Sequence, residues 1–192
     1  MSTKIDDLRH QIARLEGELE AEFERRRAAF SYTVEKKRVV FEQGVQQQHA
    51  AARQKLASYL AKARPLVVLT APFIYAVIVP FVLLDLFVTI YQAVCFPVYR
   101  IEKVRRADYI TFDRSRLSYL NALEKFNCMY CSYGNGLLAY AREIAGRTEE
   151  HWCPIKHARR IAGTHPHYPE FSDFGDAEAF QKRKQEFHAK TK

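Results

Sequence analysis

The chain has 192 residues and a formal net charge of +8, enough for one modest domain with extensions. The charge is divided around one apolar run: residues 1–64 carry a net charge of +4, and residues 100–192 carry +5. Basic segments beside an apolar run indicate contact with anionic lipid head groups. Nucleic-acid binding is the competing interpretation, but the sequence contains no nucleic-acid-binding motif. It contains no catalytic signature either, so we expect a protein that is not an enzyme.

Residues 1–64 are predicted to form one long helical arm, because they hold no proline and only two glycines, Gly17 and Gly44. Apolar pairs recur along it every eleven residues, a repeat that predicts a nearly straight or slightly right-handed coiled coil. We therefore expect a homo-oligomer that associates through residues 4–60. The alternative is a single charged helix whose apolar stripe rests on lipid or on the rest of the chain. The pairs are Leu8 and Ile12, Leu19 and Phe23, Phe30 and Val34, Phe41 and Val45, and Ala52 and Leu56.

The apolar run from Leu66 to Tyr99 is 34 residues long and contains a single charged residue, Asp85. As one helix it would be about 51 Å long, against about 30 Å of bilayer hydrocarbon. A single tilted span would place the Asp85 carboxylate deep in the hydrocarbon, at a high cost. A hairpin that turns at residues 84–86 would place it among the head groups instead. We expect residues 65–100 to be embedded in a membrane, with the hairpin favoured over the single span.

Basic residues are nearly equal in number on the two sides of the run. Within fifteen residues there are four on the N-terminal side and five on the C-terminal side. Cytoplasmic loops carry an excess of Lys and Arg, so this symmetry predicts that both soluble parts lie in the cytoplasm. The residues are Arg53, Lys55, Lys62 and Arg64, and then Arg100, Lys103, Arg105, Arg106 and Arg114.

Residues 101–163 are predicted to form a small helical domain, which makes the whole chain all-α. Its helices are expected at 114–126, 137–148 and 154–162, the last with Pro154 at its first position and Gly163 just past its end. Residues 164–192 are expected to form a loop up to residue 175 and a charged helix over 176–190.

Two short motifs in this domain have the residue types of a metal site. Cys128 and Cys131 are separated by two residues and followed by Gly and Asn residues, the form of a metal knuckle built on a tight turn. Cys153 would cap the helix that begins at Pro154, where the helix N-terminus favours a thiolate. His157 would then lie one turn further on the same face.

The sequence therefore predicts a structural zinc site with three thiolates and one imidazole, a closed tetrahedral set. The alternatives are an iron–sulfur or other redox metal, a thiol redox pair, or no joint site. His151 is the substitute ligand if His157 points away. The four predicted ligands are Cys128, Cys131, Cys153 and His157.

These motifs also carry a resemblance. The stretch Asn127-Cys128-Met129-Tyr130-Cys131, the pair Asn135-Gly136, and the stretch Trp152-Cys153-Pro154-Ile155-Lys156-His157 are similar to segments of a family of uncharacterised bacterial membrane proteins. The resemblance covers the middle and C-terminal two-thirds of the chain. It implies a bacterial inner-membrane setting and implies no activity.

The function that these observations favour is that of a membrane-anchored scaffold or interaction protein with a structural metal site. The alternative is a membrane-associated redox protein whose cysteines hold an iron–sulfur cluster or form a thiol pair. A third interpretation is a lipid or nucleic-acid tether that acts through the basic segments.

Overall fold

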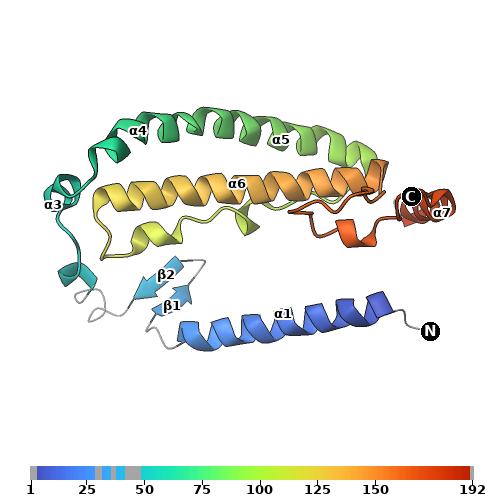
Figure 1. Cartoon of the computed structure of the whole chain (residues 1–192), viewed down its shortest axis with the longest axis horizontal. Helices are drawn as coiled ribbons and strands as arrows, with labels where there is room; N and C mark the ends of the chain where they lie inside the picture. Colours follow the sequence, from blue (N-terminus) through green and yellow to red (C-terminus); the bar gives the residue numbers. More distant parts are fainter. Residues whose placement is uncertain (1–3, 29–31, 36–37, 42–48, 191–192) are drawn as a thin grey trace. The chain divides into compact units, whose positions relative to one another are not determined.

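The computed structural model describes residues 4–28, 32–35, 38–41 and 49–190, with the backbone alone for the two strands and for residues 186–190. The chain forms two compact units, residues 1–55 with 116–121, and residues 56–115 with 122–192 (Figure 1). Helices account for most of the described residues, so the prediction of a mainly helical chain is confirmed. The described residues contain one β-sheet, which is formed by two antiparallel strands.

The first unit contains helix α1, Lys4–Ala28, followed by strands β1, Tyr32–Glu35, and β2, Arg38–Phe41. The strands are antiparallel, with Tyr32 opposite Phe41. The prediction of one helix over residues 1–64 is therefore wrong. Residues 32–41 are rich in β-branched and aromatic side chains, which favour an extended backbone over a helix. Of the predicted repeat, Phe30 and Val45 lie outside the described residues.

The second unit begins with helices α3, Leu56–Ala61, and α4, Pro65–Ala76. Pro65 is the first residue of α4, where its fixed φ suits a helix start and its missing N–H is not needed. The helix is interrupted at Val77 because Pro80 has no N–H to donate and its ring would clash with the Ala76 carbonyl.

Helix α5, Ile78–Tyr99, continues in the direction of α4 and passes through residues 84–86 without a turn. The predicted hairpin is therefore wrong, because α4 and α5 together form one apolar helix of 35 residues, Pro65–Tyr99. Among the described residues this is the one helix that is long and apolar enough to cross a membrane, by length and composition.

The chain reverses direction after α5. Arg100 adopts a left-handed conformation with φ of 57°, and the N–H of Ile101 donates to the Phe96 carbonyl at 2.8 Å. This pairing closes the end of the helix. Residues 101–115, which we call the return segment, are irregular apart from the short turns η1, Arg106–Asp108, and η2, Asp113–Arg116. The helix predicted over 114–126 is therefore not formed as such.

Helix α6, Ala122–Trp152, contains the predicted helix over 137–148 and extends far beyond it. The helix predicted over 154–162 does not form. Instead, the N–H of Lys156 donates to the Ser172 carbonyl at 2.8 Å, and the N–H of Ser172 donates to the Pro154 carbonyl at 2.9 Å. The predicted loop over 164–175 holds one short turn, η3, Tyr168–Glu170. Helix α7, Ala177–Lys190, confirms the last predicted helix.

Helices α5 and α6 pack side by side and run parallel (Figure 1). The hydroxyl of Tyr75, in the last turn of α4 just before α5, donates to the side-chain oxygen of Asn127 near the start of α6. The Tyr99 ring at the end of α5 stacks on His151 near the end of α6. The buried core between them includes two residues of the return segment, so the two regions predicted as separate domains share one core. Its members are Phe96, Val104, Ile110, Leu137, Tyr140 and Ile144.

Candidate functional site

The four predicted metal ligands lie on three different parts of the chain. Cys128 and Cys131 belong to the first third of α6 and form no turn. Cys153 is the first residue after α6, and its N–H donates to the Glu149 carbonyl at 2.8 Å. His157 lies in the extended segment beyond it, with its ring stacked on Tyr168 at a centroid distance of 6.2 Å.

This arrangement separates the proposed ligands. An α-helix rises 1.5 Å per residue, so Cys131 and Cys153 are about 33 Å apart along α6. All four cysteines of the chain are free thiols. Among the described residues, no group of three or more His, Cys, Asp or Glu side chains is arranged to hold a metal ion. The structure gives the predicted zinc site, and equally the iron–sulfur alternative, no support.

Gly134 and Gly136, which the sequence placed in a turn, lie in α6 and allow other segments to pack closely against it. A Cβ atom on Gly136 would lie 2.5 Å from the backbone oxygen of Tyr109 and 3.1 Å from the Cα atom of Ile110. A Cβ atom on Gly134 would lie 2.6 Å from the Phe81 ring. These two glycines therefore let the return segment and α5 approach the α6 backbone.

Asp85, the one charged residue of the apolar helix, faces the return segment and α6. Its carboxylate accepts two hydrogen bonds from Arg106, at 2.7 and 3.2 Å, and one from the Tyr133 hydroxyl at 3.0 Å. The Thr89 hydroxyl, one turn further along α5, donates to the same carboxylate at 3.4 Å. The carboxylate is thus compensated by groups of the protein and needs no turn at the head groups.

The other polar side chains of α5 point the same way. The side-chain oxygen of Gln92 accepts from the Val104 N–H at 2.9 Å, and its amide group hydrogen-bonds to the Val104 carbonyl and the Tyr140 hydroxyl. The Tyr91 hydroxyl pairs with the Thr148 hydroxyl at 3.0 Å. These residues recur at helical spacing and form what we call the inner face of the apolar helix: Tyr75, Phe81, Leu84, Asp85, Val88, Tyr91, Gln92 and Phe96.

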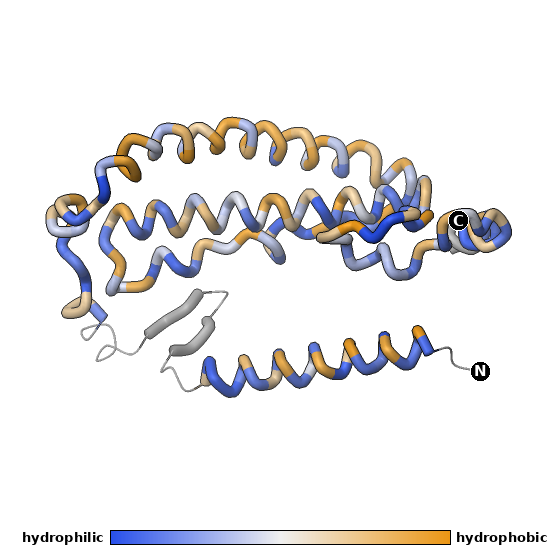
Figure 2. The backbone as a smooth tube through the Cα atoms, viewed as in Figure 1, coloured by the Kyte–Doolittle hydropathy of each residue, from blue (hydrophilic) through white to orange (hydrophobic). Residues whose placement is uncertain are grey.

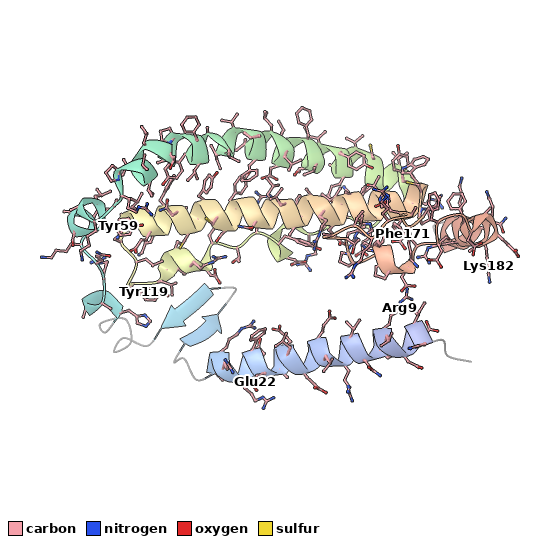
Figure 3. All side chains as sticks on the ribbon, in the orientation of Figure 1. Arg9, Glu22, Tyr59, Tyr119, Phe171 and Lys182 are labelled. Atoms are coloured by element: carbon pink, nitrogen blue, oxygen red, sulfur yellow. The ribbon has the colours of Figure 1, made fainter. Side chains whose placement is uncertain are left out.

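The opposite side of the helix has no covering element in its unit, and its side chains project away from α6 (Figure 3). Figure 2 shows that α4 and α5 are predominantly hydrophobic along their length. Every large side chain on this side is apolar and at least 40% exposed. We call the exposed apolar surface of α4 and α5 the outer face. It is one side of α5, but at the first turn of α4 it extends all round the helix, because four consecutive residues there are exposed. Its members are Leu66, Val67, Val68, Leu69, Phe73, Ile74, Val77, Val79, Val82, Leu83, Leu86, Phe87, Ile90, Val94 and Val98.

A small apolar pocket of about 250 Å³ lies beside the inner face. The hydroxyls of its three tyrosines are all used: Tyr75 donates to Asn127, Tyr130 to the Ile74 carbonyl, and Tyr133 to Asp85. The walls are therefore apolar rings and alkyl groups, suited to packing and not to proton transfer. The lining residues are Tyr75, Ile78, Phe112, Phe126, Met129, Tyr130 and Tyr133.

The C-terminal half of α6 carries a second polar cluster. The buried Glu143 carboxylate accepts from Arg147 at 2.8 Å and lies 3.0 Å from the His167 ring nitrogen. Burial alone would raise the pKa of Glu143, but the hydrogen bonds from Arg147 and His167 outweigh it and lower the pKa below the ordinary value. Glu150 and the adjacent pair of Glu149 with His165 extend the cluster. These contacts fix the segment after α6 against the helix.

No family model, no curated protein and no solved structure matches this chain. The resemblance to bacterial membrane proteins therefore stays a prediction.

Sequence reasoning missed Arg106, Tyr133 and Gln92 as partners within the apolar helix's inner face. An ionisable residue in an apolar run normally faces a partner, which signals that Asp85 has one, but Arg100, Lys103 and Arg105 are all closer to it in sequence than Arg106. Tyr133 lies between Cys131 and Gly134, in the segment predicted to form a turn, so its hydrogen bond to Asp85 was not expected.

Proposed function

We propose that this chain is a membrane-anchored scaffold protein, held to the bilayer by the outer face of α4 and α5. The observation that supports the proposal most strongly is the outer face itself, fifteen large apolar side chains with no charge among them. Soluble monomers rarely expose a contiguous apolar surface of this extent, because its contact with water is unfavourable. Lipid removes that contact without requiring a further domain.

The compartment in this proposal is the cytoplasmic side of a bacterial inner membrane. Its support is the basic residues at both ends of the apolar helix and the family resemblance of the C-terminal motifs. Anionic phospholipids attract Lys and Arg at the membrane surface by about 1 kcal/mol per residue.

Membrane attachment is tested by fractionating cells that express the full chain. We expect the protein to stay in the membrane pellet after washes with high salt and with alkaline carbonate, because apolar burial is insensitive to both. Recovery in the supernatant after the salt wash would refute attachment through the outer face.

We further propose that the scaffold self-associates through α1. Five exposed apolar residues of α1 follow a spacing of three and four, the seam of a two-stranded coiled coil. Charged residues on the other faces of α1 already pair along the helix, as Arg27 does with Glu20 and Glu24. The seam residues are Ile5, Leu8, Ile12, Leu15 and Leu19.

Self-association is tested on the full chain in detergent by sedimentation. Changing Ile12 and Leu19 to Asp places charges in the seam and is expected to convert the oligomer to a monomer. The matched control changes Ala13 and Ala21 to Asp, exposed positions of α1 outside the seam, and is expected to keep the oligomer. A wild-type chain that is already monomeric would contradict this part of the proposal.

A further inference from the structure

The path of the return segment restricts how the apolar helix can sit in a bilayer. The segment runs back along α5: Ile101 is hydrogen-bonded to Phe96, Val104 to Gln92, and Arg106 to Asp85. Further on, Phe112 lines the pocket together with Tyr75 and Ile78. Any depth that the apolar helix reaches is therefore reached by the return segment as well.

The return segment is unsuited to hydrocarbon. Its backbone is irregular, and irregular backbone exposed to lipid leaves N–H and C=O groups without partners. It also carries exposed charges beside the middle of α5: the side chains of Arg105 and Asp108 are 75% and 52% exposed. A bilayer crossing by the apolar helix would bring these charges to the depth where they are most costly.

Length points in the same direction. The apolar helix of 35 residues would be about 52 Å long, well above the roughly 30 Å of hydrocarbon in a bilayer. A helix that lies along the membrane has no such limit, and needs only one apolar side facing lipid. Along α5 the inner face is already covered by α6 and the return segment, and the outer face of α4 and α5 carries no charge.

The charges at the ends of the helix fit this orientation. Lys62 and Arg64 precede the apolar helix, and Arg100 and Lys103 follow it, all exposed. A helix parallel to the membrane holds both pairs at one depth, level with the lipid phosphates of a single leaflet. A crossing helix would place the two pairs on opposite sides.

We propose that α4 and α5 lie in the plane of one leaflet of an anionic bilayer, with the outer face in lipid and α6 on the aqueous side. The inference rests on the proposed membrane attachment and adds that the chain does not cross the bilayer. Leaflet embedding of this kind leaves both termini and the return segment on the same side of the membrane.

Depth measurement tests the orientation. Trp152, the single tryptophan, is changed to Phe, and one Trp is placed at Val68, Leu83 or Val98, three outer-face positions spread along the helix. The full-length proteins are reconstituted in vesicles of phosphatidylcholine and phosphatidylglycerol. Quenching by lipids brominated at different depths then reports each position. We expect one shallow depth for all three.

A crossing helix gives a different result, because Leu83 is fifteen residues, about 22 Å, from each of the other two positions. It would place Leu83 near the bilayer centre and the other two near opposite surfaces. A deep Leu83 between two shallow ends would overturn the inference. Circular dichroism of each variant confirms that the helices are kept, as expected for replacements at side chains that are 49% to 73% exposed.

Side-specific labelling gives an independent result. In a chain whose four native cysteines are changed to Ala, a single Cys replaces Arg64 or Lys103, and intact cells and opened vesicles are treated with an impermeant maleimide. We expect both positions to react from the same, cytoplasmic side. Reaction from opposite sides, in protein that still pellets with membranes, would overturn the in-plane orientation and leave membrane attachment standing. Protein that does not pellet with membranes would refute both.

Discussion

The two faces of the apolar helix differ both in their side chains and in their surroundings. The polar side chains of α5 that hydrogen-bond to other parts of the protein, such as Asp85 and Gln92, lie on the inner face. The outer face contains large apolar side chains alone, each at least 40% exposed. A change on the inner face should therefore act on folding, and a change on the outer face should act on membrane binding. The four predictions below test that separation.

The largest expected effect is on the outer face. Changing Leu83, Phe87 and Ile90 to Glu removes three large apolar groups from lipid, and at about 2 kcal/mol each this weakens membrane binding by about 6 kcal/mol. We expect the protein to move to the soluble fraction in flotation experiments, with its circular dichroism spectrum unchanged.

The control for this variant changes Thr111, Ala145 and Ala158 to Glu, exposed positions away from the outer face. It alters the net charge by the same amount and is expected to stay with the membrane. Equal release of both variants would show that charge, and not the outer face, governs attachment.

The next largest effect concerns the close packing behind the inner face. Gly136→Ala forces the added Cβ against the Tyr109 backbone oxygen, which cannot move without displacing the return segment. We expect a loss of about 3 kcal/mol in the free energy of unfolding. Gly134→Ala meets only the end of the Phe81 ring and is expected to cost about 1 kcal/mol.

Denaturant titration in detergent, followed by circular dichroism, measures both values. Gly17→Ala in α1, where nothing lies within 4 Å, is the control and is expected to stabilise its helix. The packing argument fails if Gly136→Ala unfolds at the same denaturant concentration as the wild type.

A smaller effect is expected at the ion pair. Arg106→Leu leaves the Asp85 carboxylate without its cation, at a cost of about 2 kcal/mol, moderated because Arg106 is half exposed. The double variant Asp85→Leu with Arg106→Leu removes both charges and is expected to recover most of the loss. Unfolding of both variants in detergent measures the difference. A double variant less stable than Arg106→Leu alone would contradict the pairing.

The smallest effect is a dependence on pH. The pKa of Glu143 is lowered in the folded protein, so its ionised form stabilises the fold above the ordinary carboxyl pKa of 4.5. This contribution is lost as the pH falls below 4.5 through the lowered pKa. We expect wild-type thermal stability to fall more steeply in that range than the stability of Glu143→Gln. Membrane binding should not share this pH dependence, because the outer face has no titratable group.

The helical character and the place where the apolar helix begins were both predictable, because apolar runs and a proline at a helix start are local signals. The direction in which Asp85 points was not, since its partner Arg106 lies 21 residues away along the return segment. A single acidic residue in an apolar run is compatible both with a hairpin turn and with an ion pair inside the chain. The distinction depends on packing that periodicity does not encode.

The predicted metal site finds no support in the structure for a related reason. Cys-x-x-Cys followed by Gly and Asn is typical of a tight turn, yet the same spacing places both cysteines on one side of a helix. The glycines at 134 and 136 are needed for contact with Phe81 and Tyr109, residues far away in sequence. Glycine is favoured both in tight turns and where another segment packs closely on a helix. In this chain, contacts with residues distant in sequence select the helix.

The parallel arrangement of α5 and α6 has a consequence for the order of folding. Contacts of the apolar helix with α6 join residues about 50 positions apart, as Tyr75 of α4 with Asn127 and Tyr91 of α5 with Thr148. During synthesis at about 5–20 residues per second, α5 therefore waits roughly 3–10 s for the matching turns of α6. Throughout that interval the inner face is not yet covered by α6, so both faces of α5 are exposed. The growing chain is expected to meet lipid before it meets its own second helix, so that α6 closes over a helix already lying on the membrane.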